Sequence, residues 1–202
     1  MGDVAVTVPD DGAVRMHDGQ LALLPTDTVY GLAAAAGRPD VCRRLYELKQ
    51  RPLDQPTAIM LGSLTRLIET VPELTDRAVE ICRKLLPGPV TLIVPNPAGR
   101  FAHLCGGSPD RIGVRVPDLE IAVAGLADAV GGLMISSANE RGGPDPARLD
   151  QVPRSIRAAA GFEVDGGELP GVPSSVIDVT GEQPRVLRLG TGVDRVMAAV
   201  LR

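Results

Sequence analysis

Short apolar runs alternate along the chain with amphipathic segments of helical length. The runs predict strands at residues 4–8, 21–24, 58–61, 90–94, 112–116, 133–135, 174–179 and 185–189, and a further apolar run covers 29–36. Apolar spacings of three and four predict a short helix around Val14 and Met16, and helices at residues 40–49, 64–71, 74–85, 119–130 and 193–201.

The order of these elements favours one α/β domain over residues 1–202. Strands and helices are interleaved without a regular βαβ rhythm, which predicts a twisted sheet of mixed parallel and antiparallel strands with helices flanking it. A chain of 202 residues is long enough to bury roughly 70% of its unfolded surface in one core. Residues 140–153 and 165–173 are dense in glycine, proline and charge, so we expect loops beside a site there.

Composition narrows the class of ligand. The formal charge is −4 and the pI is near 5.2, so the surface as a whole lacks the positive charge that binds nucleic acid. There is no Trp, and aromatic residues make up 2% of the chain, which argues against stacking platforms for single-stranded nucleic acid. Local basic patches remain open.

Cysteine usage and hydropathy predict a cytoplasmic protein. Three cysteines without a CxxC pair, together with two histidines, argue against structural zinc and fit a reducing compartment. The first residues do not read as a secretory signal, and no run approaches the roughly 20 apolar residues of a membrane span. We therefore expect a soluble protein with no membrane partner.

The segment PTDTVYGL, residues 25–32, is unusually polar for the end of an apolar strand. Four of the six residues from 25 to 30 have side chains that can form hydrogen bonds. Period-2 alternation puts Thr28 and Tyr30 on one face, where they could contact a small zwitterion. Thr26 and Asp27 equally fit a local Asx or ST turn. We expect Asp27 to brace the loop rather than to perform chemistry.

A KxRP motif, formed by Lys49, Arg51 and Pro52, ends the helix predicted at residues 40–49. Pro52 disfavours helical geometry at Arg51, so the chain turns and both cations can converge on an anion such as a phosphate. The alternative is a solvated helix terminus whose cations complement the helix dipole.

Further polar groups occur on or beside other strands. Arg111 and Arg115 lie four residues apart on one strand, hence on one face, and need an anionic partner, either an internal carboxylate or a ligand. SSAN, residues 136–139, follows a strand, where open α/β sheets bind ligands, although a helix cap is an alternative. PSSVID, residues 173–178, puts hydroxyls at a strand entrance, and Arg188 ends the next strand. PGPVT, residues 87–91, is a rigid turn of architectural value.

Taken in order, PTDTVYGL, KxRP, PGPVT, VRVP, SSAN and PSSVID with the following LRLG resemble the YrdC/Sua5 family of threonylcarbamoyl-adenylate synthases. The resemblance runs from about residue 20 to 190. The family's KxR...SxN signature is matched by Lys49, Arg51, Ser137 and Asn139. The resemblance implies a YrdC-like fold, and the end of the chain soon after the last motif implies the short form, without the C-terminal domain of longer Sua5-type members.

The resemblance implies an ATP-dependent synthesis. L-threonine and bicarbonate form a carbamate that attacks the α-phosphate of ATP, which gives threonylcarbamoyl-AMP and pyrophosphate for the N6-threonylcarbamoyl modification of adenosine 37 in tRNA. The implied cofactor is Mg²⁺, held through the ATP phosphates rather than by a protein metal site. Two further partners are left open, tRNA itself and the downstream transferase complex.

The resemblance also implies roles for individual residues. Contacts with L-threonine are expected from Thr28, Tyr30, Arg115 and Ser174. Contacts with the nucleotide are expected from Lys49, Arg51, Arg111, Ser137, Asn139 and Arg188. Catalysis is expected from Lys49 and Arg51, because phosphoryl chemistry asks mainly for positioning and charge neutralisation. No residue is identified as a general base.

Some positions depart from the usual family pattern. Gln55 stands where a lysine is frequent, Met60 where some members have a histidine, and Ser175 where a threonine is more frequent. Glu140 and Arg141 follow Asn139 where the family often reads SANxSG. Two alternatives stay open: a YciO-like paralogue with a different activity, and a tRNA- or double-stranded-RNA-binding module without synthase activity.

Overall fold

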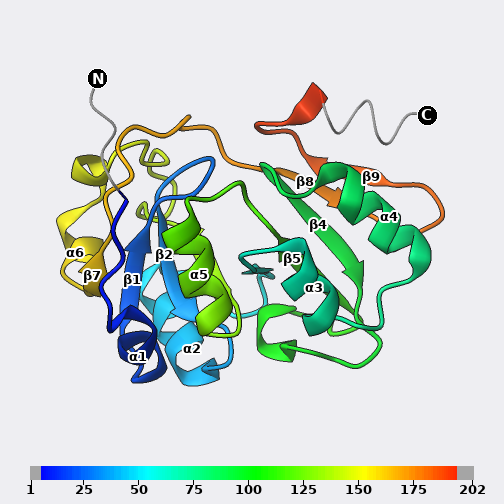
Figure 1. The fold of residues 1–202 in the computed structure, drawn as a ribbon, viewed down its shortest axis with the longest axis horizontal. Coiled ribbons are helices and arrows are strands. Elements are labelled where there is room, and N and C mark those ends of the chain that lie inside the picture. Colours follow the sequence, from blue (N-terminus) through cyan, green and yellow to red (C-terminus); the bar gives the residue numbers. More distant parts are fainter. Residues whose placement is uncertain (1–5, 195–202) are drawn as a thin grey trace.

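The computed structural model describes residues 6–194, and a nine-stranded sheet forms its centre. The strands are β1 (Leu21–Leu24), β2 (Gly31–Ala35), β3 (Ala58–Met60), β4 (Val90–Pro95), β5 (Arg111–Arg115), β6 (Leu133–Ser137), β7 (Ala160–Glu163), β8 (Ser175–Asp178) and β9 (Arg185–Arg188). Their order is β7-β1-β2-β6-β3-β5-β4-β8-β9, with β7 and β9 at opposite ends of the molecule (Figure 1). Within the described part, five neighbouring pairs are antiparallel and three are parallel. The predicted mixed α/β sheet is confirmed.

Helices connect and cover these strands. They are α1 (Gly12–His17), α2 (Pro39–Leu48), α3 (Leu64–Thr70), α4 (Asp76–Leu85), α5 (Ile121–Ala129) and α6 (Arg154–Arg157), with 3₁₀ turns at Ala102–Leu104 and Leu149–Gln151. Ser63 and Thr75 start α3 and α4 by accepting hydrogen bonds from backbone N–H groups three residues on. No helix within residues 6–194 is long and apolar enough to cross a membrane.

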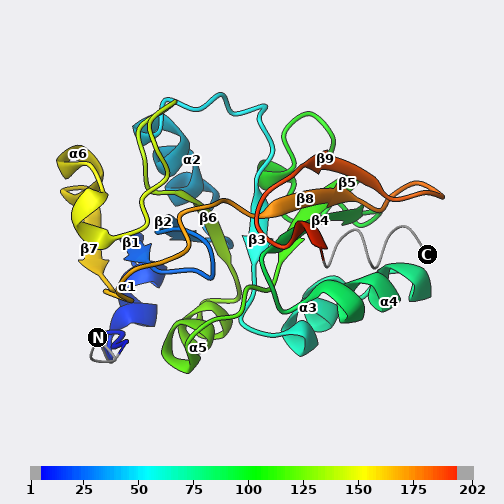
Figure 2. The ribbon, with the colours of Figure 1, turned by 90° about the horizontal axis from the view of Figure 1, so that it is seen from above.

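Two apolar cores fill the space between the sheet and the helices. In β1, the odd-numbered Leu21 and Leu23 pack in the core that contains α2, α3 and α4, whereas Ala22 and Leu24 pack in the core with α1 and α5. This alternation is the two-residue period of a strand that is buried on both faces. Figure 2 shows α2 and α5 on opposite sides of β1 and β2.

A row of residues across the middle of the sheet is left without a helix over it. Ile135, Ala58, Gly113 and Ile93 are successive neighbours across β6, β3, β5 and β4, and all four line one cavity. Two of them are small, and a Cβ at Gly113 would lie 3.1 Å from the Cβ of Ala58. Small side chains therefore make this part of the sheet the floor of a hollow.

The structure differs from the sequence prediction at the ends of the chain. The strand predicted at residues 4–8 does not form over the described residues 6–8, and residues 4 and 5 lie outside the description. The helix predicted at 193–201 also lies outside it, apart from its first two residues. β7 and α6 were not predicted, because their four-residue length is too short for a periodic signal.

Candidate active site

The sheet floor and the loops around it enclose a cavity of about 880 Å³, a size typical of small-molecule sites. Most of its charged side chains are positive: Lys49, Arg51, Arg111, Arg115, Arg141 and Arg188 line it, against the carboxylates Asp54 and Asp145. The excess of cations favours an anionic ligand.

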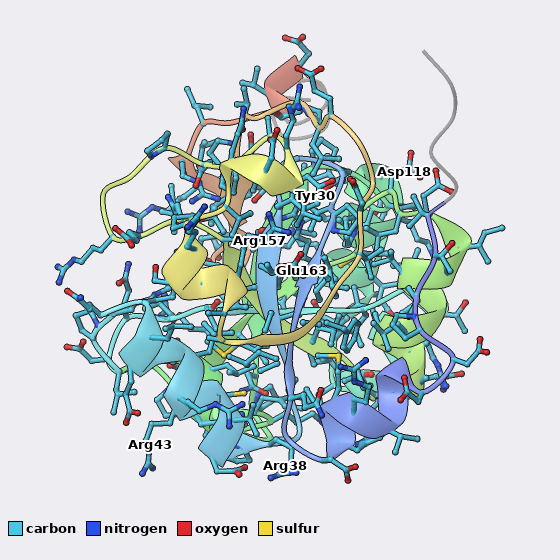
Figure 3. All side chains as sticks on the ribbon, turned by 90° about the vertical axis from the view of Figure 1, so that its left-hand side faces the viewer. Tyr30, Arg38, Arg43, Asp118, Arg157 and Glu163 are labelled. Carbon is cyan, nitrogen blue, oxygen red and sulfur yellow. The ribbon has the colours of Figure 1, made fainter. Side chains whose placement is uncertain are left out.

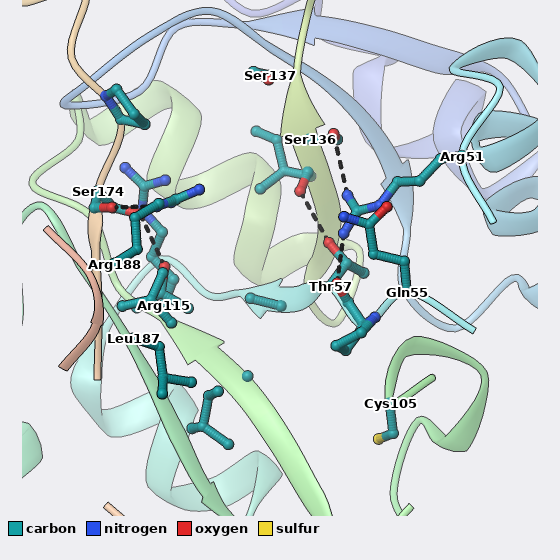
Figure 4. A pocket seen from close by; sticks show the side chains of 18 of the residues that line it. Arg51, Gln55, Thr57, Cys105, Arg115, Ser136, Ser137, Ser174, Leu187 and Arg188 are labelled. Carbon is teal, nitrogen blue, oxygen red and sulfur yellow. Dashed lines mark hydrogen bonds between the residues drawn. The ribbon is translucent and has the colours of Figure 1, made fainter. Parts of the chain in front are cut away.

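The polar residues of the cavity form two groups on either side of the floor (Figure 4). One group lies at the C-terminal end of α2 and contains Arg51 with Ser136. The other contains Arg115, Ser174 and Arg188.

Lys49 is a buried lysine whose contacts are all with the SSAN segment. Its side chain is 7% exposed, and its Nζ donates to the carbonyl oxygen of Ser137 at 2.5 Å, to the carbonyl oxygen of Asn139, and to Oδ1 of Asn139 at 2.6 Å. These acceptors engage all three N–H groups of the ammonium. A solvated helix terminus is therefore excluded, and Lys49 ties the end of α2 to the loop after β6.

Asn139 also connects Lys49 to the rest of the loop after β6. Its Oδ1 also accepts from Ser137 Oγ at 2.8 Å, and its Nδ2 donates to the carbonyl oxygen of Gly143 at 2.7 Å and to Asp145 Oδ1 at 3.1 Å. No helix begins in residues 136–139, so the helix-cap alternative is wrong. Ser137 lines the cavity, whereas Asn139 stands behind it and holds the loop.

The pKa of Lys49 is lowered to about 8, chiefly by burial; Asp145 opposes the shift and the nearby Arg51 adds to it. Folding thus favours the neutral form of Lys49, so keeping this residue charged below about pH 8 lowers the stability of the folded protein. The free energy of unfolding therefore rises as the pH increases from about 8 to the pKa of an unfolded lysine. An anionic ligand favours the charged form instead.

We expect the affinity for ATP to fall as the pH rises through about 8, because Lys49 then loses the charge that attracts the phosphates. Calorimetric titration of ATP from about pH 7 to 9.5 measures this, since the charge of ATP itself changes little over most of that range. Lys49→Arg, which stays charged, should flatten the profile. An equally steep fall in this variant would assign the dependence to another group.

Arg51 reaches the floor because the chain turns sharply after α2. Gln50 lies in the left-handed region with φ 49°, which redirects the chain before Pro52. The guanidinium of Arg51 stacks 5.3 Å from the ring centre of Tyr46, and it donates to the carbonyl oxygen of Pro56 at 2.5 Å and weakly to Ser136 Oγ at 3.5 Å. Its Nε is buried and has no partner. Arg51 as a whole lines the cavity, so its charge can act on a ligand bound there.

Side chains of the PTDTVYGL turn hold Arg115 in place. Its Nη2 donates to Asp27 Oδ1 at 2.5 Å and to the hydroxyl of Thr28 at 2.7 Å, and Arg115 is 8% exposed. The second oxygen of Asp27 accepts from the backbone N–H of Asp118. Asp27 braces Arg115, in line with the expectation that it performs no chemistry. The Nε of Arg115 is buried and unpartnered, and the residue as a whole lines the cavity.

Ser174 and Arg188 close the same side of the cavity. Arg188 donates from Nε to the carbonyl oxygen of Ser174 at 3.0 Å and from Nη2 to its hydroxyl at 3.2 Å, and the hydroxyl also lies 3.1 Å from Thr91 Oγ1. The pKa of Arg188 is lowered mainly by burial, with repulsion from Arg115 and Arg51 adding to it. Arg51, Arg115 and Arg188 all line the same cavity.

Arg111 lies on the same face of β5 as Arg115, as predicted from their spacing, but it is half-exposed. Its Nη1 is 3.5 Å from Asp178 Oδ2. Arg111 and Arg115 are thus each paired with a carboxylate of the protein, and of the two only Arg115 has a buried N–H group without a partner.

The chain is similar to known proteins in sequence and in fold. The Sua5/YciO/YrdC family model, described as telomere recombination, matches residues 15–190. The chain belongs to this family. It is 34% identical over 176 residues to the threonylcarbamoyl-AMP synthase of Pyrococcus abyssi, covering 87% of this chain and 52% of that protein. It is 34% identical over 173 residues to the threonylcarbamoyl-AMP synthase of Escherichia coli O1:K1 / APEC, covering 83% and 89%.

A solved structure of a family member adds a ligand to the comparison. The crystal structure of P. abyssi Sua5 complexed with L-threonine matches with a TM-score of 0.80 and 32% identity, over 93% of this chain and 56% of that one. The chain thus spans about half the length of the P. abyssi relative.

The structure brings most of the predicted site residues of this family member together. Eight of the residues proposed from sequence line the one cavity, namely Thr28, Lys49, Arg51, Arg111, Arg115, Ser137, Ser174 and Arg188. Tyr30 does not line it. The hydroxyl of Tyr30 donates to Asp165 Oδ1 at 2.9 Å and lies 2.8 Å from the carbonyl oxygen of Gly167, and it accepts from the N–H of Gly166. Tyr30 faces the side that carries α6 and β7 (Figure 3).

We expect Tyr30→Phe to leave the KM for L-threonine within about twofold and to lower the free energy of unfolding by about 1–3 kcal/mol, because the loop at 165–167 loses its buried partner. Steady-state kinetics and urea unfolding measure the two effects. A rise of about tenfold in KM with unchanged stability would instead put Tyr30 in the substrate site.

The structure also adds cavity residues that sequence reasoning missed. Ser136, Thr57, Arg141 and Asp145 all line the cavity. Ser136 is adjacent to a predicted residue, but the other three lie in loops whose path no periodic pattern reveals. Ser175, next to Ser174, is instead structural: its hydroxyl donates to Thr191 O and accepts from Gly190 N.

Proposed function

We propose that the protein is an L-threonylcarbamoyladenylate synthase, which forms threonylcarbamoyl-AMP and pyrophosphate from L-threonine, bicarbonate and ATP. One observation carries the proposal: a single cavity joins the Lys49 and Arg51 group to the Thr28, Arg115 and Ser174 group. The names of the relatives and the threonine-complexed structure support it.

The amino acid is assigned to the side of Arg115. A carboxylate there could pair with the guanidinium of Arg115, which lines the cavity and which Asp27 holds in place through Nη2. The hydroxyls of Thr28 and Ser174 flank it and suit the polar groups of threonine.

The nucleotide is assigned to the side of Arg51. Arg51 contributes its guanidinium, Lys49 adds a desolvated positive charge, and Arg188 adds a further cation from the Arg115 side of the same cavity. Charge held in a partly dry site is worth more than charge in water, so these groups suit the phosphates of ATP. In this arrangement Lys49 acts chiefly by its charge and by positioning Ser137.

The chemistry requires positioning more than proton transfer. The threonine amine attacks the carbon of bicarbonate, and the bond from that carbon to the hydroxyl group breaks. The departing hydroxide takes up the proton that the amine loses and leaves as water, which gives a carbamate. A carbamate oxygen then attacks the α-phosphorus of ATP, and the bond to the pyrophosphate oxygen breaks. The cations hold the attacking carbamate and the phosphates together and neutralise the charge that develops.

The residues present fit Mg²⁺ that arrives with the nucleotide. Within residues 6–194 no group of three or more His, Cys, Asp and Glu side chains is placed to bind a metal. The cavity supplies two separate carboxylates, Asp54 and Asp145, and Mg²⁺ is commonly held by one or two carboxylates with substrate phosphates and water. Bound Mg²⁺ supplies charge neutralisation at the phosphates.

The product would serve the N6-threonylcarbamoyl modification of adenosine 37 in tRNA, with hand-off to tRNA or to a transferase complex. We place the protein in the cytoplasm, where buried free thiols such as Cys42, Cys82 and Cys105 stay reduced.

Pyrophosphate release tests the proposal. Release should require L-threonine, bicarbonate and Mg²⁺ together with ATP, and omission of any one should abolish it. Release independent of threonine and bicarbonate would favour a YciO-like paralogue with another activity. No release, with a tRNA mobility shift at moderate salt, would favour the RNA-binding module.

A further inference from the structure

The cavity arginines differ in whether a carboxylate already neutralises them. Arg111 and Arg115 are paired with Asp178 and Asp27. Among the described residues, Arg51, Arg141 and Arg188 have no carboxylate within ion-pair distance. The last three are therefore the guanidinium groups whose charge is most available to an anionic ligand.

Arg141 is the least engaged of these three. Its only described hydrogen bond is a long one, from Nη1 to the carbonyl oxygen of Gln50 at 3.3 Å. Since a guanidinium has five N–H donors, four remain without a protein acceptor. Arg141 is exposed, so its stem can move at the mouth of the cavity that it lines.

The contact with Gln50 fixes where this free charge lies. Gln50 is the residue between Lys49 and Arg51, so the guanidinium of Arg141 lies over the turn that carries the other two cations. Lys49 is buried and Arg51 is partly buried, whereas Arg141 is exposed to solvent. A chain of phosphates running outward from the interior would pass from Arg51 to Arg141.

We propose that Arg141 binds the terminal phosphates of a nucleoside triphosphate and thereby gives the site its preference for polyphosphate over monophosphate. The proposal rests on the proposed use of ATP. Arginine suits this role because its fork contacts two phosphate oxygens at once.

Calorimetric binding of inorganic tripolyphosphate, ATP and AMP, each with Mg²⁺, tests the proposal without turnover. We expect Arg141→Gln to weaken tripolyphosphate and ATP about five- to tenfold, and AMP by less than about twofold. Arg141→Lys should recover part of the loss. The difference between wild type and Arg141→Gln should shrink at high salt.

Arg43→Gln is the matched control. Arg43 is an exposed arginine of α2 that lies at the outer edge of the molecule in Figure 3 and does not line the cavity, and its replacement removes the same charge. We expect it to weaken tripolyphosphate by less than about twofold. Equal losses in the two variants would reduce the effect to overall charge and overturn the proposal.

A merely structural role for Arg141 predicts another result. If Arg141 only braced the carbonyl of Gln50, then Arg141→Gln would weaken AMP as much as tripolyphosphate and would lower the Tm, and the proposal would fail. The proposed function can fail separately: a wild-type protein that binds tripolyphosphate through Arg141 but makes no threonylcarbamoyl-AMP would refute the synthase alone.

Discussion

Arg115→Gln is expected to lower kcat/KM for L-threonine by about 10²- to 10³-fold, because the substrate carboxylate loses its charged, forked partner. The same change leaves Asp27 as a buried carboxylate without its ion-pair partner. Breaking such a pair costs about 3–5 kcal/mol, so the variant should also be less stable. Kinetics at varied threonine and urea unfolding give the two numbers.

The double variant Arg115→Gln/Asp27→Asn separates these two effects. An amide at position 27 no longer needs a cation, so most of the lost stability should return while the threonine defect remains. Recovery of activity together with stability would show that Arg115 acts only by holding the fold. Asp27→Asn alone should keep threonine binding within about tenfold, since the guanidinium stays in the cavity.

Lys49→Ala should produce the second large effect, a fall of about 10²- to 10³-fold in kcat/KM for ATP. The change removes a desolvated charge, and it frees the carbonyl oxygens of Ser137 and Asn139, so the loop after β6 loses its tie to α2. The Kd for L-threonine should change by less than about fivefold, because Arg115 and Thr28 keep their contacts.

Lys84→Ala is the natural control, because Lys49 and Lys84 are the only two lysines of the chain. Lys84 is exposed on α4 and pairs with Glu80 at 2.7 Å, so its loss should leave ATP kinetics unchanged. If Lys49→Ala turned over ATP as well as Lys84→Ala, the KxR pair would be no more than the end of a helix.

Much of the fold follows from local patterns in the sequence. Most strands and helices formed where two-residue or helical periodicity was strong, and the spacing of Arg111 and Arg115 correctly placed both on one face of β5. The KxR motif likewise converged on the cavity because Pro52 and the left-handed Gln50 end the helix. In each case the cause lies within a few residues of the effect.

The features that the sequence did not predict depend on contacts between segments far apart in the chain. Period 2 grouped Thr28 with Tyr30, but the turn carries Tyr30 to the loop at 165–167, more than 130 residues away. The pairing of Arg115 with Asp27 and the enclosure of Lys49 by Asn139 depend on strand order, which periodicity leaves open. Composition predicted a loop beside a site at residues 140–153, but it did not identify Arg141 and Asp145 as the residues of that loop that line the cavity.

The central claim is tested most directly by analysing the product of the wild-type protein. Incubation with L-threonine, ¹³C-bicarbonate, ATP and Mg²⁺, followed by mass spectrometry, should show an adenylate that contains threonine and one ¹³C atom. Pyrophosphate should appear in equal amount, and Arg115→Gln should lose both signals. ATP consumption that yields AMP or ADP without ¹³C-labelled threonylcarbamoyl-AMP would contradict the account.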